Sequence, residues 1–315
     1  MVEQGHSSLT ETFPEIAKEL IDMDRRGFLA APQESEAALR ERVNNTLSGI
    51  HEFQTAIREQ GLTVDGIRLE ADNQTPDELI HPLFESLEQK LGINPRWIPV
   101  YYINRGLGMF GGGGMFSGTD ENTGRNVTFF VLREAFRNQQ KWLIYSRDEI
   151  MTHEFCHAAR AGFDEPLFEE VVAYRSGTSL FRKYMGGAFR SIARTQLLLV
   201  FLALFWVGFF VQLNGGALWI QALLQLPMPL YISCLAAEGI FRQTQAEQTA
   251  QHLQPIFGKW TEAVLLRLSD KELSELSKKP FSSPEHLTQW IAEKKDELRW
   301  QIIIQRFYPT EKDFT

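Results

Sequence analysis

Two histidines and a glutamate lie within five residues of one another in His-Glu-Phe-Cys-His, residues 153–157. In a helix, His153 and His157 are four residues apart and project from one face, with Glu154 beside them. Catalytic zinc takes imidazole nitrogens at about 2.0–2.1 Å and keeps a position open for water, which a carboxylate can deprotonate. The spacing predicts His153 and His157 as metal ligands and Glu154 as general base. The alternative is two half-buried core histidines beside a solvated glutamate.

Capping residues predict where the helix that carries this motif begins and ends. Ser146 and Glu149 have the spacing of a capping box, and Gly162 suits a C-terminal cap. Between them we expect one helix, directly after a strand at 141–146 that is rich in apolar and aromatic residues. In such a helix the apolar Phe155 can anchor the face opposite the histidines.

Acidic residues follow the motif in Glu-Pro-Leu-Phe-Glu-Glu-Val-Val-Ala-Tyr, residues 165–174. Together with His-Glu-x-x-His, this segment resembles the gluzincin type of the zincin metallopeptidase superfamily. Gluzincins take a third ligand from a glutamate on the next helix, often in a Glu-x-x-Ala context, which Glu170-Val-Val-Ala173 matches. The resemblance implies Zn²⁺ as cofactor and Glu170 as third ligand. Glu169 is the alternative, and Asp164 is a further possibility.

The resemblance also implies the reaction, hydrolysis of peptide bonds in a protein or peptide substrate with Glu154 accepting a proton from water. It leaves two supporting roles open. A donor for the oxyanion could be one of four tyrosines, Tyr101, Tyr102, Tyr145 and Tyr174. Tyr174 stands where several gluzincins have an acidic residue, so candidates for orienting the imidazoles are Asp148, Asp164 and Glu165.

A block without Asp, Glu, Lys or Arg runs from Thr195 to Ala237, interrupted by Asn-Gly-Gly at 214–216. A bilayer span needs roughly 20 apolar residues, so the block predicts a transmembrane hairpin of two helices at 195–237. The alternative is a pair of buried core helices. Five basic residues precede the block, Arg175, Arg182, Lys183, Arg190 and Arg194. They predict a cytoplasmic location for the N- and C-terminal regions and are most simply a membrane-surface anchor.

The remaining segments predict an α+β fold. Apolar spacing indicates helices at 11–30 and 33–60, one from Thr75 to Gly92, and a helical tail at 241–253, 260–268 and 283–307. Strands are expected at 96–103 and 125–132. The glycine-rich segment 106–118 contains Gly-x-Gly-x-x-Gly, but no helix signal follows it, so a mobile loop is preferred to a nucleotide site.

These elements suggest four parts. An N-terminal helical region covers 1–95, a zincin-like catalytic core with a small β-sheet 96–190, the hairpin 195–237 and a C-terminal helical region 238–315. The N-terminus has no basic segment followed by an apolar one, so no cleaved signal peptide is expected.

The combined prediction is an integral-membrane zinc metallopeptidase. Its alternatives are a non-catalytic membrane-anchored protein-interaction module and a zincin-like fold that has lost peptidase activity. A net charge of −8 argues against nucleic acid as the main partner. The sequence does not predict an oligomeric state.

Overall fold

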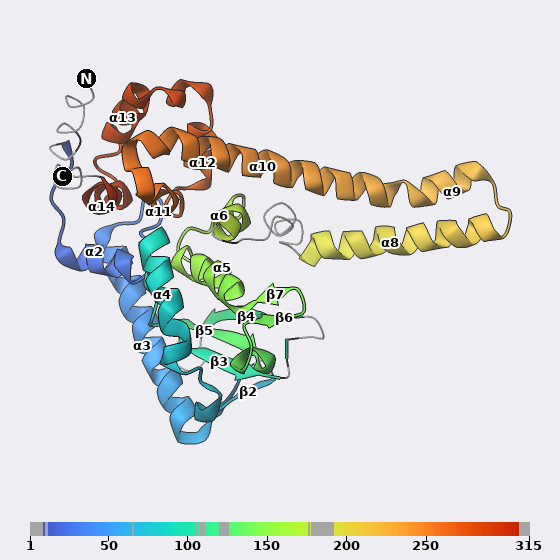
Figure 1. The fold of residues 1–315 in the computed structure, drawn as a ribbon, viewed down its shortest axis with the longest axis horizontal. Helices are drawn as coiled ribbons and strands as arrows, with labels where there is room; N and C mark the ends of the chain where they lie inside the picture. Colours follow the sequence, from blue (N-terminus) through green and yellow to red (C-terminus); the bar gives the residue numbers. More distant parts are fainter. Residues whose placement is uncertain are drawn as a thin grey trace.

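A computed structural model describes residues 9, 12–64, 66–104, 106–107, 111–119, 126–175, 177 and 192–308. Over these residues the protein is an α+β body from which a long pair of helices projects (Figure 1). The expected coarse fold class is confirmed, because helices predominate, the sheets are small and two apolar helices are long enough to span a membrane.

The main sheet has three strands in the order β3-β5-β4: β3 (Val100–Ile103), β5 (Asn126–Arg133) and β4 (Gly113–Thr119). β3 runs parallel to β5 and β4 runs antiparallel to it. Successive side chains of a strand point to opposite faces. Phe129 and Val131 accordingly pack in a cluster with residues of α3 (Glu36–Gln60), whereas Phe130 and Leu132 share the main core with α4 (Asp77–Leu91) and α5 (Arg147–Ala159).

Of the three predicted strands, one is confirmed, one is shorter than predicted and one is replaced by a hairpin. The strand at 125–132 is confirmed as β5, and the one at 96–103 is reduced to β3. The single strand at 141–146 is wrong, because β6 (Lys141–Trp142) and β7 (Tyr145–Ser146) form a hairpin that turns at Leu143 with φ +51°. A bulky residue rarely adopts that conformation, so composition gave no sign of the turn. Two further strands, β1 (Leu62–Val64) and β2 (Ile67–Leu69), pair antiparallel.

The glycine-rich segment is also different from its prediction, because its second half is strand β4 instead of a loop. The glycines allow close packing at this place. A Cβ on Gly112 would lie 2.8 Å from Ile150 Cδ1, and one on Gly113 would lie 2.7 Å from the carbonyl oxygen of Val131. Small residues therefore let β4 approach both β5 and the helix that carries the histidines.

The helical predictions are largely confirmed at the N-terminal end. α2 (Lys18–Arg25) and α3 lie within the segments predicted at 11–30 and 33–60, and α4 ends at Gly92, whose φ of 65° and ψ of 24° are left-handed. The C-terminal helices are α11 (Thr261–Leu265), α12 (Asp270–Leu276), α13 (Pro284–Ala292) and α14 (Leu298–Phe307).

The prediction of one long helix at 283–307 is wrong, because α13 and α14 are separate helices. Two side chains of α14 reach the same buried carboxylate of α12: Arg299 Nη1 lies 2.6 Å and Trp300 Nε1 2.7 Å from the oxygens of Glu272. This contact fixes the direction of α14 independently of α13.

The main core joins three of the four predicted parts, the regions 1–95, 96–190 and 238–315. It contains buried residues from Leu9 to Tyr308, drawn from both sides of the projecting helices in the sequence. A buried ion pair adds to it, with Arg267 Nη2 2.7 Å from Asp24 Oδ2 and both side chains almost inaccessible to solvent. The N-terminal and C-terminal regions therefore form one body.

The projecting pair consists of α8 (Ile192–Leu213) and, after a turn at Asn214–Gly216, α9 (Leu218–Gln225) and the first half of α10 (Pro227–Phe257). The apolar side chains of this pair are widely exposed, and only 6% of the most apolar window of α8 is buried. α10 does not end at residue 237 but continues unbroken into the body (Figure 1). At the base of the pair, Glu238 bridges Arg194 and Arg242.

Candidate metal centre

Apolar packing fixes α5 in the body. Phe155 and Cys156 are completely buried, and the Phe155 ring lies 5.5 Å from that of Phe84 on α4 and 6.1 Å from that of Phe130 on β5. This leaves the opposite face of α5 for His153, Glu154 and His157, as the helical spacing predicts.

Both ends of α5 differ from the capping predictions. Ser146 is at the N-cap and is also the last residue of β7, but its side chain accepts no amide hydrogen bond from the described helix. The helix ends at Ala159, before Gly162, with Arg160 as its C-cap. The Arg160 guanidinium is buried and donates to the carbonyls of Leu266 and Leu268, which draws the chain out of the helix.

Three predicted ligands meet at one point. His153 Nε2 and His157 Nε2 lie 3.0 Å apart. The carboxylate of Glu170, on α6 (Glu169–Arg175), lies 3.5 Å from His153 Nε2 and 3.4 Å from His157 Nε2 through its two oxygens. Among the described residues, this is the one group of three or more His, Cys, Asp or Glu side chains with ligand atoms close enough for one metal ion.

The three side chains lie close enough together to hold one metal ion of the size of zinc. Metal bonds of about 2.0–2.1 Å at tetrahedral angles separate neighbouring ligand atoms by about 3.3–3.4 Å. The two Nε2 atoms are 3.0 Å apart, and each lies 3.4–3.5 Å from a different oxygen of Glu170, so one atom from each residue lies within 4.8 Å of the others. Two neutral imidazoles and one carboxylate are also a donor set that catalytic zinc uses.

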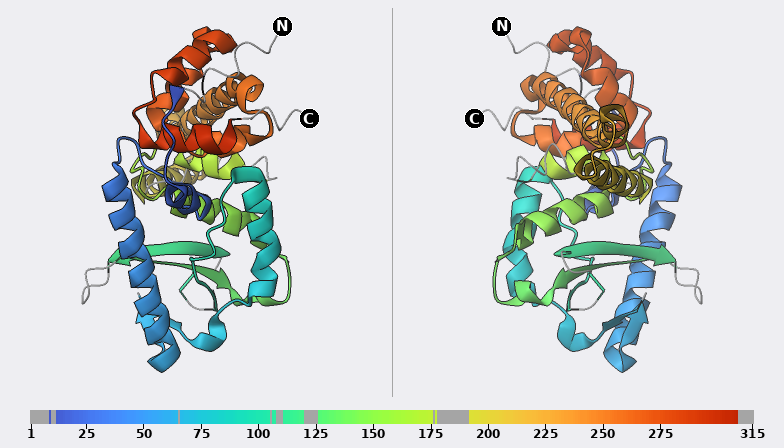
Figure 2. Two further views of the ribbon diagram at one scale, coloured as in Figure 1. Left: turned by 90° about the vertical axis from the view of Figure 1, so that its left-hand side faces the viewer. Right: turned by 90° about the vertical axis from the view of Figure 1, so that its right-hand side faces the viewer.

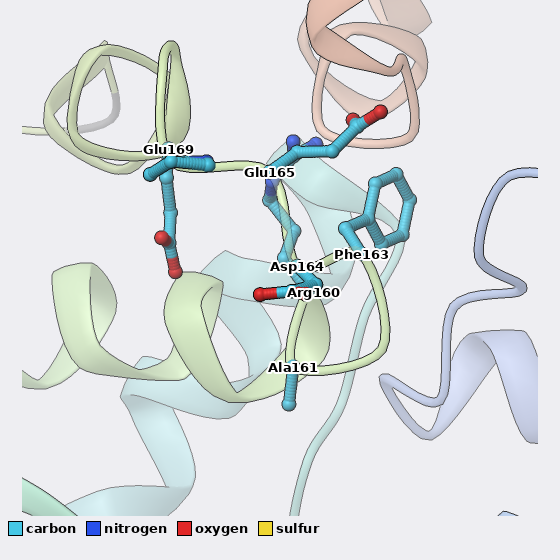
Figure 3. Close-up of a pocket in the computed structure, with 7 residues that line it drawn as sticks. Arg160, Ala161, Phe163, Asp164, Glu165 and Glu169 are labelled. Atoms are coloured by element: carbon cyan, nitrogen blue, oxygen red, sulfur yellow. The ribbon is translucent and has the colours of Figure 1, made fainter.

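Glu169 has a different place from Glu170. Its Oε1 lies 2.8 Å from His157 Nδ1, the ring nitrogen that faces away from the meeting point. Figure 3 shows this carboxylate directed from α6 toward α5, at the edge of a pocket lined by residues 160–161, 163–166 and 169. A hydrogen bond at Nδ1 fixes the tautomer and orientation of a histidine that binds metal through Nε2.

Electrostatics at His157 follow from these contacts. Burial disfavours the imidazolium, but hydrogen bonds to Glu169 and Glu170 outweigh it and raise the pKa of His157 to about 10. Burial likewise opposes the charge of Glu169, yet the bond to His157 lowers the pKa of that carboxyl. Because a histidine binds metal as the neutral imidazole, a divalent cation at Nε2 would compete with protons for His157.

Glu154 lies next to the ligands and faces β4. Its Oε2 accepts a hydrogen bond of 3.2 Å from the backbone N–H of Met115. Because burial is the largest influence on it, the pKa of the Glu154 carboxyl is raised above its usual value. A raised pKa brings a carboxyl closer to the range in which it can both accept and return a proton near neutral pH.

Of the four tyrosines considered as oxyanion donors, Tyr174 is the one in ring contact with a ligand histidine. Its ring centroid lies 4.0 Å from that of His153. Tyr101 and Tyr102 are fully buried on the two faces of the main sheet. Tyr145 stacks on Trp142 in the β6–β7 hairpin.

Two of the three acidic residues proposed to orient the imidazoles have other contacts, and the third, Asp164, lines the pocket beside Glu169. Asp148 pairs with Arg147, and Glu165 accepts from the backbone N–H of Asp270. The carboxylate that does contact the Nδ1 atom of a predicted ligand histidine is that of Glu169. Sequence reasoning had considered Glu169 only as an alternative ligand.

No protein-family model, curated protein or solved structure matches this chain. A function for this chain is therefore inferred from the geometry of the site.

Residues far away in the sequence hold α6, and none was predicted. The carboxylate of Asp270 accepts hydrogen bonds of 2.7 and 3.0 Å from the backbone N–H groups of Leu167 and Phe168, which precede α6. At the other end, Arg175 is buried and makes a two-point ion pair with Glu262, so Arg175 is not a membrane-surface anchor. Arg182, Lys183 and Arg190 lie outside the described residues.

Proposed function

We propose that this protein is a zinc-dependent peptidase whose catalytic body is attached to a membrane by the α8–α10 hairpin. The observation that carries the proposal is the meeting of His153 Nε2, His157 Nε2 and the Glu170 carboxylate within reach of one metal ion, with Glu154 beside them. The hydrogen bond between His157 Nδ1 and Glu169 Oε1 further supports the proposal, because metal-binding histidines usually have such a partner.

His153, His157 and Glu170 would hold the ion. A zinc ion there would supply a Lewis acid that polarises a substrate carbonyl and acidifies water. Glu154 would take the proton from the attacking water and deliver it to the leaving amine. The bond from the Met115 N–H keeps the Glu154 carboxylate in one orientation for both transfers. Tyr174 is the tyrosine best placed to donate to the oxyanion.

The outer edge of β4 is the proposed substrate-binding element. β4 is an edge strand, and the Met115 N–H on its outer side points to Glu154. An extended peptide can add to such an edge through backbone hydrogen bonds. A peptide paired with β4 would pass Glu154, which favours a protein or peptide substrate.

The hairpin is proposed to cross the bilayer. α8 and the segment that starts at Leu218 are long and apolar enough, and they present large apolar side chains to the outside. The ends of the two helices at the body meet in the Arg194–Glu238–Arg242 cluster, whose charges belong at a polar boundary. Because the chain returns, the body lies on one side, which the basic flank predicts to be cytoplasmic.

The test compares Glu154→Gln and His153→Ala with the parent protein for bound zinc and for cleavage of a peptide library. Glu154→Gln should keep zinc and lose activity by about 10²–10⁴-fold, the usual contribution of a general base. His153→Ala should lose both. Zinc retained by a parent that cleaves no peptide would favour a fold without peptidase activity, and absence of zinc from the parent would refute the proposal.

A further inference from the structure

The turn of the β6–β7 hairpin exposes two large aliphatic side chains. Leu143 is 66% and Ile144 76% exposed. Two-residue turns of this kind normally contain Gly, Asn or Asp, because one or both positions need positive φ. Leu143 nevertheless adopts φ +51°. Neither solubility nor backbone preference explains two aliphatic residues at this turn, which points to an apolar partner.

The residues on each side of the turn are typical of a membrane–water boundary. Trp142 and Tyr145 flank the two aliphatic residues and stack on each other with their ring centroids 6.2 Å apart. Tryptophan and tyrosine are enriched at the level of lipid headgroups. Lys141 is exposed beside them, and the guanidinium of Arg133 lies 4.3 Å from the Trp142 ring centroid. Cations at this level are attracted by anionic headgroups.

The position of the turn agrees with this chemistry. In Figure 1 the β6–β7 hairpin lies at the end of the body from which the projecting helices leave, at the level along the long axis where α8 begins. α8 begins close to the Arg194–Glu238–Arg242 cluster, which lies at the polar end of the α8–α10 hairpin. A bilayer that contained the apolar part of α8 would have its near surface at the β6–β7 turn.

We propose that the Leu143–Ile144 turn inserts into the near leaflet of the bilayer that the α8–α10 hairpin crosses. The inference depends on the membrane part of the proposed function and not on its zinc site. The turn leads directly into α5, so its insertion would hold the catalytic helix at a fixed height above the lipid. Substrates would then be peptide segments close to the membrane surface.

The test uses full-length protein with Cys234→Ser and a spin label at one of three positions, Ile144→Cys, Phe210→Cys or Leu79→Cys. Cys156 is completely buried and stays in place. Phe210 lies on α8, and Leu79 is an exposed residue of α4, a helix on the side of the body away from the α8–α10 pair (Figures 1 and 2). The protein is reconstituted in phosphatidylcholine vesicles containing one quarter phosphatidylglycerol. Collision of each label with oxygen, which concentrates in lipid, is compared with collision with a water-soluble nickel chelate.

Oxygen should dominate at positions 144 and 210, and nickel at position 79. Lipid contact at 210 with water contact at 144 would overturn the inference while the membrane span stands. Water contact at both would overturn the span and the inference together. Dipolar broadening between labels at 144 would assign the turn to a second copy of the chain and also overturn the inference.

A second measurement does not depend on a label at the turn. In Leu143→Gly/Ile144→Ser, glycine takes the positive φ without strain and the apolar tip is removed. A label at Lys141→Cys should then show several-fold less collision with oxygen than in the parent turn. The matched change Leu79→Ser should leave the oxygen collision of the label at position 141 unaltered. Bound zinc should be equal in the parent, the double variant and Leu79→Ser. An unchanged label at 141 in the double variant would contradict the inference.

Discussion

The two helices that form the candidate metal centre differ in how they are supported. α5 supplies two histidines and Glu154, and it is held by apolar side chains that are completely buried against α4 and β5. α6 supplies the third carboxylate, has seven residues and is held by polar contacts from Asp270, Glu262 and α10. Isolated helices of this length are unstable in water. Both helices therefore bury apolar residues in the main core, including Val171 and Val172 of α6, but the two ends of α6 are held in addition by distant charged side chains.

Phe155→Ala should have the largest effect, because it removes the apolar support of α5. Truncation of a buried phenylalanine costs about 3–5 kcal/mol of folding stability. Thermal unfolding of the reconstituted protein should shift strongly downward, and zinc binding should be lost with the fold. Leu79→Ala, at an exposed position, is the control and should change stability by less than about 0.5 kcal/mol. Equal stability of the two variants would show that α5 is not anchored as described.

Glu169→Ala should have the next largest effect, and on metal binding more than on stability. Loss of a carboxylate that orients a histidine ligand typically weakens metal affinity by about 10–100-fold. Glu169→Gln keeps a hydrogen-bond acceptor at His157 Nδ1 and should recover part of the loss. Titration with zinc under a competing chelator measures both. If Glu169→Ala lost zinc completely and Glu170→Ala retained it, Glu169 would be the ligand and Glu170 would not.

Asp270→Asn tests whether distant polar contacts position α6. The asparagine keeps one acceptor oxygen, so about one charge-assisted hydrogen bond of roughly 1.5 kcal/mol is lost, equivalent to about tenfold in zinc affinity. The thermal transition of the body should move little, because the core is unaltered. A large drop in thermal stability without a change in zinc affinity would mean that Asp270 supports the body and not the site.

Arg175→Lys should have the smallest effect. Lysine keeps the charge but cannot make the two-point contact that Arg175 makes with Glu262. Zinc affinity should fall by only a few-fold, because Asp270 still holds the other end of α6. A loss as large as that of Glu169→Ala would show that the contact to α11 dominates the positioning of Glu170.

The contrast between α5 and α6 explains how much could be predicted from the sequence. The side-chain face of α5 follows from local spacing, and Gly92 ends α4 through its own backbone freedom. The choice between Glu169 and Glu170 was not accessible in this way. Each residue turns a helix by about 100°, so that choice depends on where α6 begins. Asp270, 103 residues beyond Leu167, binds the backbone just before that start.

Other differences have similar causes. The turn at Leu143 has no glycine or asparagine to mark it, and the separation of α13 from α14 depends on a carboxylate of α12. The hairpin could be predicted because forty-three uncharged residues are a property of composition alone. The ligand roles and the reaction remain predictions that the experiments above address.

The single core that joins residues near both ends of the chain has a consequence for biosynthesis. Its members extend from Leu9 to Tyr308, and the Asp24–Arg267 pair closes a loop of 243 residues around the hairpin. The ribosome completes α8 and α9 before α11 to α14 exist. If the hairpin crosses a bilayer, it must be inserted while the body is still incomplete. Maturation of the metal centre would then be the last step, because Asp270 and Glu262 are translated after insertion.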